Sequence, residues 1–446
     1  MFRRDAMKSL QKWKGQERRK PLIIRGARQV GKTTLVQEFS KRFDTFFHLN
    51  LEKQADKELF ERNFSVRDIL SAMHLHSNVL KEPGSTLVFI DEIQNSPQAV
   101  ASLRYFYEEM PEVYVIAAGS LLESMFNVDT SFPVGRVQYM ALRPCSFSEF
   151  LEAMGETAIK DALQNMELPP PIHNRVVKLF NEYVLVGGMP EAVASYAENK
   201  DIVALSGIYE TLISGYRDYT EKYAKSETIQ NVLRYILTYG FQYAGQRIKF
   251  EHFANSNYRS REMGEAFRVL EKAFLLELSY PTTSVSIPMF PDMKKSPKLL
   301  WMDTGLINYS MGLQKELFGI NDISEVWKGK IAEHIVGQEL LSIADSVSTR
   351  RNFWVREAKN SQAEVDFLYP YNSKIIPIEV KSGSGSKLKS LHLFMEASPG
   401  DLAVRFWNSP MSLDTITLPS GKEYTLMNLP LYYAGQLKAI LDKYVS

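Results

Sequence analysis

Cysteine is almost absent from this sequence: Cys145 is the single cysteine among 446 residues. One thiol cannot form an intramolecular disulfide, which excludes a disulfide-stabilised scaffold, and an unpaired thiol is usual where thiols stay reduced. Long apolar runs are also missing, because no window approaches the ~20 apolar residues that a membrane-spanning helix needs. The basic N-terminus lacks the following apolar segment of a secretory leader. We therefore expect a cytoplasmic protein that does not enter a membrane.

An excess of one charge is missing as well. The 53 Lys and Arg residues balance 52 Asp and Glu residues, for a formal net charge of +1. Any surface for nucleic acid is therefore confined to local patches. Residues 1–20 form one such patch, with eight basic residues. Met7, Leu10 and Trp13 recur there at a spacing of three, which predicts an amphipathic helix with a solvated basic face.

Length and hydrophobic pattern divide the chain into segments. Domains of ~100–200 residues predict about three units with separate cores. In the first third, the apolar runs PLIIRG, DTFFHLNLE, STLVFIDE and VYVIAAGS alternate with stretches long enough for crossover helices, which predicts a parallel sheet covered on both faces. Residues 143–222 are predicted to be mostly helical. Three helical stretches and two strand-like runs follow over residues 223–300, the order of a winged-helix module. The last third begins with a helix and continues into strands.

The octapeptide GARQVGKT fits the pattern G-x-x-x-x-G-K-[ST] and lies between the strand PLIIR and a helix. Glycines let backbone N–H groups turn toward phosphate oxygens, Lys32 brings a compensating charge to the β and γ phosphates, and the Thr33 hydroxyl can ligate Mg²⁺. We therefore predict that ATP and Mg²⁺ are bound by the loop and the start of its helix, namely by Gly26, Ala27, Arg28, Gln29, Val30, Gly31, Lys32, Thr33 and Thr34.

The apolar run STLVFIDEIQ contains two acidic residues at its polar end, Asp91 and Glu92. In a parallel sheet the carboxyl ends of the strands face the ligand crevice. Asp91 can therefore reach the Mg²⁺ shell, and Glu92 can act as the general base that polarises the attacking water. Two acids at a strand end are common on a surface. Together with the phosphate loop, however, they predict hydrolysis rather than binding alone.

Three further residues are candidates for the same site. Ser120 ends the strand VYVIAAGS, where a polar residue can sense the γ phosphate, although small residues are frequent at strand ends. Arg136 is a candidate to neutralise charge in the transition state, either within its own chain or in a neighbouring copy of a homo-oligomer. Arg143 is the competing candidate. Either arginine can instead be a structural ion-pair partner.

Several segments carry a resemblance to a known family, namely GARQVGKTTL, FIDEIQ, AAGS, VGRVQYMALRPCSFSEFL, YVLVGGMPEAV, KLLWMDTGL, EVDF and IEVKSG. The chain resembles the bacterial and archaeal AAA-like P-loop ATPases that carry a C-terminal domain of unknown function with restriction-endonuclease-like motifs. The resemblance implies an ATPase core with an additional strand, a helical lid and a winged-helix region. It also implies that Gly187, Gly188 and Pro190 line the lid side of the nucleotide. Read alone, these residues form only a turn between helices.

The segment EVDFLYPYNSKIIPIEVKSG predicts two strands joined by a turn at its Asn-Ser pair. In that register Asp366 faces Glu379, and Glu364 faces Lys381. The four side chains share one face because they differ by two within each strand. Opposed carboxylates repel in the absence of a cation. An Asp followed by Glu-x-Lys on the next strand is the pattern of restriction-endonuclease-like nucleases, in which the acids hold Mg²⁺ and the lysine orients the attacking water.

Glu333, on the helix GKIAEHIVGQELL, matches the helical acid that this fold often adds. We therefore predict a metal site formed by Glu333, Asp366 and Glu379, with Lys381 beside it. The alternative is a solvated hairpin whose acids and lysine form ordinary cross-strand ion pairs. Such a domain can also survive as a binding module without activity.

The expected fold is a multidomain α/β chain. It comprises a P-loop ATPase core with a parallel sheet (residues 1–155), a helical lid (156–222), a winged-helix-like region (223–300) and a restriction-endonuclease-like α/β domain (301–446). On the third helical stretch of the winged-helix-like region, Arg261, Arg268 and Lys272 share a face that can track DNA phosphates or lie in solvent.

The leading functional hypothesis is an ATP-hydrolysing switch or motor. It is coupled to a nuclease-like domain that binds DNA or RNA and is a candidate to cut it. A second hypothesis is a nucleotide-gated scaffold with an inactive nuclease-like domain. A nucleotide kinase is disfavoured, because small phosphate acceptors do not require such long accessory regions.

Overall fold

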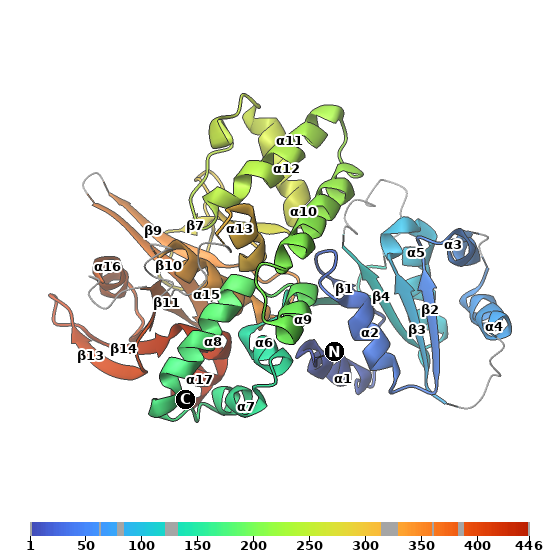
Figure 1. The fold of residues 1–446 in the computed structure, drawn as a ribbon, viewed down its shortest axis with the longest axis horizontal. Helices are drawn as coiled ribbons and strands as arrows, with labels where there is room; N and C mark the ends of the chain where they lie inside the picture. The colour runs from blue at the N-terminus through green and yellow to red at the C-terminus, as the bar shows by residue number, and fades with distance from the viewer. Residues whose placement is uncertain are drawn as a thin grey trace.

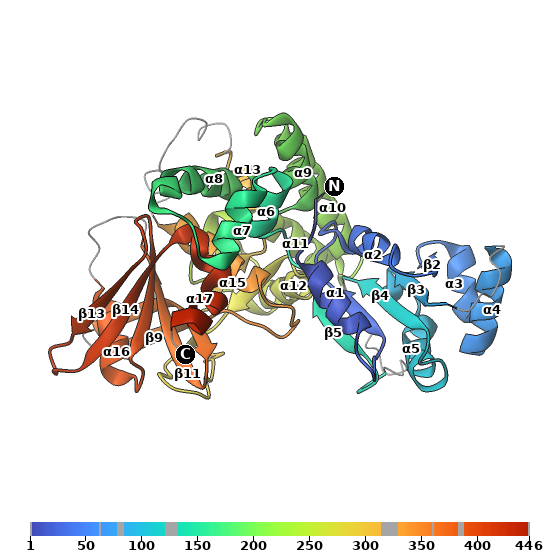
Figure 2. The ribbon, with the colours of Figure 1, turned by 90° about the horizontal axis from the view of Figure 1, so that it is seen from below.

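Two β-sheets lie at opposite ends of the molecule, and most of the helices pack between them (Figures 1 and 2). The computed structural model describes residues 2–61, 64–77, 84–120, 133–313, 329–358, 361–381 and 388–444. Within these ranges, no helix combines the length and the apolar character needed to cross a bilayer.

The N-terminal sheet is parallel, with the strand order β2-β3-β4-β1-β5. Its strands are β1 (Leu22–Arg25), β2 (Thr45–Asn50), β3 (Thr86–Asp91), β4 (Tyr114–Gly119) and β5 (Gln138–Ala141). β4 lies between β1, which leads into the phosphate loop, and β3, which ends in Asp91. The predicted parallel sheet and its additional strand are therefore confirmed.

Helices cover both faces of this sheet. One face packs against α1 (Ala6–Lys14) and α2 (Lys32–Ser40), and the other packs against α3 (Gln54–Glu61), α4 (Val66–His76) and α5 (Pro97–Glu109). Adjacent residues of β1 point to opposite faces, so Ile23 joins one core and Ile24 the other. Met7, Leu10 and Trp13 of α1 are buried, which confirms the predicted amphipathic helix.

The middle of the chain is helical, as predicted. Its first part contains α6 (Phe147–Ala153), α7 (Thr157–Asn165), α8 (His173–Val186), α9 (Pro190–Asn199) and α10 (Leu205–Glu221). It continues with α11 (Glu227–Tyr239), α12 (Ser260–Lys272) and an antiparallel pair of strands, β6 (Leu276–Ser279) and β8 (Lys298–Trp301).

One element of the predicted winged helix is much shorter than expected. The segment KFEHFANS forms only a short 3₁₀ turn, η5 (Phe253–Asn255), because His252, Ala254 and Asn255 adopt left-handed backbone conformations that interrupt a helix. The winged-helix interpretation and the four domain boundaries stay predictions.

The C-terminal sheet is mixed, with the strand order β13-β14-β12-β11-β10-β9-β7. Its strands are β7 (Pro281–Thr282), β9 (Asn352–Ala358), β10 (Ser361–Tyr371), β11 (Lys374–Val380), β12 (Leu402–Trp407), β13 (Ser412–Thr417) and β14 (Glu423–Pro430). The described α-helices that follow β8 in the chain are α13 (Thr304–Ser310), α15 (Lys330–Ser342), α16 (Lys389–Ala397) and α17 (Leu437–Tyr444). β10 and β11 form the predicted hairpin in the predicted register, with Phe367 opposite Ile378. Asn372 and Ser373 form its turn with positive φ angles.

Helices α6 to α12, here called the helical region, share one hydrophobic core with the C-terminal sheet. This core runs from Ala27 and Cys145 through α8, α10 and α15 to Leu441. Helix α15 lies inside this core and is buried on nearly all sides. The prediction of separate cores is therefore wrong for this face of the C-terminal sheet, whereas the face that packs against α16 has a core of its own. The prediction remains correct for the two faces of the N-terminal sheet, whose cores are distinct from the shared one.

Candidate active site

The phosphate loop connects β1 to α2 and is shaped by backbone conformations that favour glycine. Gly31, the residue before α2, has a φ of 94°. A side chain at Gly26 would overlap the carbonyl oxygen of Leu142. Lys32 is buried, and its Nζ donates hydrogen bonds to the carbonyl oxygens of Gly26 at 3.0 Å and Ala27 at 2.8 Å. The phosphate loop therefore wraps around the Lys32 side chain, whose ammonium group its carbonyl oxygens bind.

The acidic strand end meets the start of α2 directly. The Thr33 hydroxyl donates a hydrogen bond to Asp91 Oδ2 at 2.6 Å, and His48 Nε2 of β2 lies 3.7 Å from the same oxygen. Burial alone would raise the pKa of Asp91, but hydrogen bonds from His48, Thr33 and the Glu92 backbone hold it below its ordinary value. Asp91 thus offers an ionised carboxylate oxygen beside a hydroxyl, which is a donor set that suits Mg²⁺. His48 carried no motif that could have identified it.

Glu92 and Ser120 lie at the carboxyl ends of β3 and β4, as the sequence predicts. Glu92 has a left-handed backbone with a φ of 52°, and its carboxylate accepts a hydrogen bond from the Gln94 amide. The Ser120 hydroxyl is hydrogen-bonded to the Tyr219 hydroxyl of α10. Tyr219 was not anticipated. The available signal was the pair of tyrosines in GYRDYT, three residues apart on a helix.

A cavity of about 560 Å³ opens over the loop. Arg28, Gln29, Gly31, Lys32, Thr33, Thr34 and Glu92 line it. Pro190, which the resemblance assigned to the lid side of the nucleotide, also lines it, and so do Arg3 and Arg4 of the N-terminal segment. The sequence did not predict a role for Arg4, which connects the phosphate loop to α6. Its Nη1 donates a hydrogen bond to Val30 O at 3.1 Å, and its Nε forms an ion pair with Glu149 at 2.9 Å.

The Gly187-Gly188 turn is held by a buried acid. Asp303 accepts hydrogen bonds from the Gly188 N–H and from Leu306 N at the start of α13. A side chain at Gly188 would overlap the backbone of Cys145, and one at Gly187 would overlap Asp303. The two glycines therefore let this turn pack tightly against Asp303 and against Cys145, which is buried.

A family model described as an AAA domain matches residues 18–151, the segment that contains the sheet, the phosphate loop and the acidic strand end. Residues 18–151 form a P-loop ATPase domain. Two models described as domains of unknown function match the rest, DUF8612 over residues 177–317 and DUF4143 over residues 328–419. The chain is also similar to the Walker-type ATPase PABY2304 of Pyrococcus abyssi, at 13% identity over 70% of this chain and 96% of that chain, with a TM-score of 0.41. No curated protein matches the chain.

The two candidate arginines do not join the nucleotide cavity of the ATPase domain. Arg136 precedes β5, at the amino ends of the parallel strands and opposite the phosphate loop, and it pairs with Glu108. Its proposed role within its own chain is therefore wrong, whereas a role in a neighbouring copy stays a prediction. Arg143 follows β5 at the loop end of the sheet but lines two other cavities.

A second cluster of charged groups lies at the base of the C-terminal sheet. Glu364 and Asp366 of β10, Glu379 of β11 and Glu333 of α15 gather there, and Lys381 Nζ lies 2.5 Å from Glu379 Oε1. The hairpin thus brings together the predicted set. Burial raises the pKa values of Glu333, Asp366 and Glu379 above their ordinary values.

Lys298 of β8 was not predicted, and it occupies this cluster. Its Nζ lies 2.6 Å from Glu333 Oε1 and 2.7 Å from Glu364 Oε1, and its side chain is buried. Burial would lower the pKa of Lys298, but Glu333, Asp366 and Glu364 raise it above its ordinary value, so the group is charged. The available signal was a lysine at the start of the apolar strand KLLW.

The predicted C-terminal metal site does not fit this arrangement. Among the residues that the structure describes, no three Asp, Glu, His or Cys side chains are placed to hold a metal ion. The ammonium groups of Lys298 and Lys381 instead neutralise the acids. The cluster differs from the cross-strand ion pairs of the alternative interpretation as well, because Lys381 pairs with Glu379, two residues before it in the chain, and Lys298 reaches Glu333 and Glu364 from β8.

Proposed function

We propose that the chain binds Mg²⁺-ATP at the phosphate loop, hydrolyses it, and thereby switches the arrangement of the helices over the site. The observation that carries this proposal is the 2.6 Å hydrogen bond between Thr33 and Asp91, because it brings the loop and the acidic strand end within reach of one cation. When bound, Mg²⁺ would offset the negative charge of the phosphate groups. Thr33 and Asp91 would hold it, and Lys32 would turn from the loop carbonyls toward the phosphates.

Glu92 is the residue that we assign to proton transfer. It directly follows Asp91, and the hydrogen bond from Gln94 fixes the orientation of its carboxylate. A carboxylate beside the γ phosphate position can orient water and accept its proton. Ser120, at the end of the neighbouring strand, would sense the same phosphate, and its contact with Tyr219 would pass that information to α10.

A chain of buried tyrosines supports the proposed switch. Tyr219 and Tyr209 lie on α10, and the Tyr209 hydroxyl donates a hydrogen bond to the C-terminal end of α8 at Val186 O. Tyr183 of α8 donates to Glu339 Oε1 of α15 at 2.7 Å. Helix α15 lies in the core that continues into the C-terminal sheet. A movement of α10 on nucleotide hydrolysis would therefore be transmitted to the C-terminal half.

Replacement of Lys32 tests the ATPase proposal. Lys32→Ala should abolish Mg²⁺-dependent ATP turnover, because the charge that faces the β and γ phosphates is lost. Lys41→Ala is the matched control, since this exposed lysine directly follows α2 and pairs with Glu38. Turnover is measured as phosphate release from purified full-length protein. Normal turnover by the Lys32 variant would refute the proposal.

The position of Lys298 favours an inactive C-terminal domain, and thus the nucleotide-gated scaffold as a second candidate. The competing nuclease would use Glu333, Asp366 and Glu379 with Lys381, and it predicts Mg²⁺- or Mn²⁺-dependent cleavage that is lost in Asp366→Ala and Lys381→Ala. Single-stranded, duplex and branched DNA and RNA are the substrates to test. Cleavage of any of them by the wild type alone would overturn the scaffold interpretation.

Nucleic acid remains a candidate partner because Arg261, Arg268 and Lys272 of α12 are exposed. ATP turnover measured with and without DNA or RNA tests this role. Stimulation that is lost in Arg261→Ala would support a nucleic-acid-coupled switch in a winged-helix module. An unchanged rate with every nucleic acid would count against it.

A further inference from the structure

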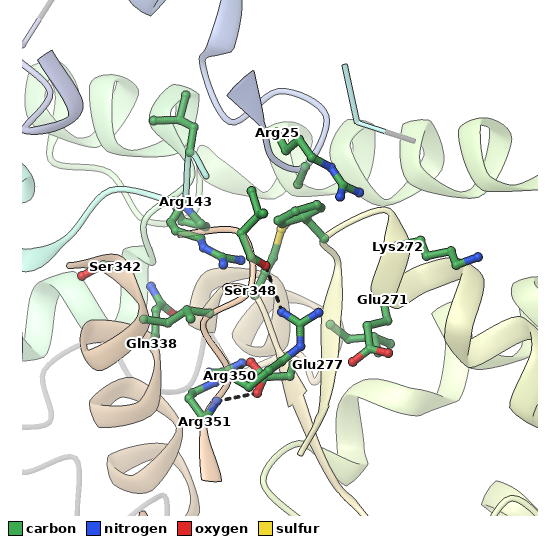
Figure 3. Close-up of a pocket in the computed structure, with 18 of the residues that line it drawn as sticks. Arg25, Arg143, Glu271, Lys272, Glu277, Gln338, Ser342, Ser348, Arg350 and Arg351 are labelled. Carbon is green, nitrogen blue, oxygen red and sulfur yellow. Dashed lines mark hydrogen bonds and ion pairs between the residues drawn. The ribbon is translucent and has the colours of Figure 1, made fainter. Parts of the chain in front are cut away.

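A second cavity, of about 380 Å³, lies where the ATPase domain meets the helical region and α15. The ATPase domain contributes Arg25, at the end of β1, and Arg143, after β5. The segment between α15 and β9 contributes Arg350 and Arg351. Figure 3 shows Arg25, Arg143 and Arg350 around one space, whereas Lys272 points away from it. Ala27 of the phosphate loop lines this cavity, but Lys32, Thr33 and Glu92 do not, so the cavity adjoins the loop and is distinct from the one that these three residues line.

The charge of this cavity is strongly unbalanced. Its lining contains six basic and two acidic side chains, an excess of four positive charges in a chain whose net charge is +1. One of the acids, Glu277, is engaged by Arg351, which donates to it from the backbone N–H at 2.7 Å and from Nε at 3.1 Å. The remaining arginines therefore face a shortage of local counter-charge.

Arg143 shows this shortage most clearly. Its Nε and Nη2 atoms are removed from solvent and have no hydrogen-bond partner among the described residues. Its guanidinium lies 5.2 Å from the ring of Phe274. Burial lowers the pKa of Arg143 to about 10, and although Glu277 opposes this shift, Arg351, Arg350 and Arg25 add to it. A buried charge without a partner is costly, and an anion in the cavity would remove that cost.

We propose that this cavity binds a small phosphate-bearing anion of the di- or triphosphate class. Guanidinium groups match phosphate oxygens with paired N–H donors, and the volume is within the range of small-molecule sites. The recessed position of Arg25 and Arg143, both more buried than Arg350, favours a compact anion over a nucleic-acid backbone. Because Arg25 directly precedes the phosphate loop, such a ligand would join the ATPase domain to the C-terminal half.

Inorganic tripolyphosphate is the probe, titrated by calorimetry into the full-length Lys32→Ala variant, in which the nucleotide site is impaired. We expect one binding site. Addition of Arg143→Met should weaken binding at least tenfold, because two unpartnered donors are lost. Arg175→Met is the matched control, because it removes the same charge from an exposed position on α8, and it should change the affinity less than twofold. Citrate should bind at least tenfold more weakly than tripolyphosphate.

Folding of the variants is checked by thermal unfolding without ligand. Arg143→Met should unfold at the same temperature as its parent or higher, since an unpaired buried charge is removed. If it unfolds at a lower temperature, the exposed Arg350 provides the second variant, and Arg350→Met should also weaken binding. The proposal is overturned if tripolyphosphate does not bind, if the Arg143 and Arg175 variants bind it equally well, or if citrate binds as tightly as tripolyphosphate. It is also overturned if duplex DNA competes with tripolyphosphate for binding and this competition requires Arg143.

Discussion

The ammonium group of Lys298 lies within hydrogen-bonding distance of two carboxylates, Glu333 and Glu364. Lys298→Met should therefore destabilise the protein, because it leaves these acids without their cation in a buried cluster. Loss of one partner of a buried ion pair costs about 3–5 kcal/mol. Glu364 is 36% exposed, however, so we expect the lower part of that range. Urea unfolding measures the loss.

Two further variants separate this effect from a general loss of a lysine. Lys374→Met removes an exposed pair with Asp401 from the same sheet, and it should cost less than about 1 kcal/mol. Combining Lys298→Met with Glu333→Gln should recover part of the stability, since one uncompensated acid is removed. Additive losses in the double variant would show that Lys298 does not neutralise Glu333.

Some residues of the candidate sites could be located from the sequence, and others could not. The positions of the phosphate loop, Asp91, Glu92 and Ser120 were predictable because each lies at the end of a strand in a local motif. Lys298 and Tyr219 were not, because each reaches its partner from an element distant in the sequence. Arg136 was misplaced for a related reason: its proximity in sequence to β5 did not reveal which end of the sheet it occupies.

Among the elements, the β10–β11 hairpin was predictable in register because its two-residue turn fixes which residues oppose each other. The helical region was predictable in type from its apolar periodicity. The short η5 was not, because KFEHFANS has the pattern of a helix, yet three of its residues adopt left-handed conformations. A local pattern therefore determines an element only where no tertiary contact or turn competes with it.

Helix α10 provides a test of the proposed switch at the level of an element. Tyr219→Phe removes the hydrogen bond to Ser120 and should lower the rate of ATP turnover roughly tenfold, as expected for an interaction of about 1.4 kcal/mol that is needed for hydrolysis. Binding of a fluorescent ATP analogue should change little. Steady-state turnover and equilibrium titration measure the two quantities.

The control is Tyr239→Phe, at the exposed end of α11. It should leave both turnover and binding unchanged. Equal turnover in the Tyr219 variant and the wild type would contradict a role for the Ser120 contact, whereas an equal loss of binding and turnover would assign Tyr219 to nucleotide affinity.

At the scale of the whole molecule, the length of the chain suggested units with separate cores, but the helical region and the C-terminal sheet share one. The shared core could not be predicted from the sequence, because α15 lies between the helical region and the C-terminal sheet and is apolar enough to pack in the core of either one. Its polar residues are buried as well. Glu339 accepts hydrogen bonds from Phe147 N at 3.0 Å and from Tyr183 at 2.7 Å, and so ties α15 to α6 and α8.

Glu339 should make the stability of this shared core depend on pH. Burial raises its pKa from about 4.5 to about 7; hydrogen bonds from Tyr183 and Phe147 oppose this shift, and the nearby charges of Glu149 and Asp5 add to it. Between these two values the folded state binds more protons at this site than the unfolded state does. The free energy of unfolding therefore falls as the pH rises through this interval, and this group's contribution levels off once Glu339 is ionised in both states, above the folded-state pKa of about 7.

Glu339→Gln removes this titration while retaining an oxygen that can accept both hydrogen bonds. Urea unfolding at intervals between pH 5 and pH 8 should show that the wild type loses on the order of 2 kcal/mol more than the variant over this range. Glu198→Gln, at an exposed position near the end of α9, should follow the wild-type curve. Parallel curves for Glu339→Gln and the wild type would mean that Glu339 is already ionised in the folded protein at pH 5. Its buried charge would then have to be stabilised by the two hydrogen bonds alone.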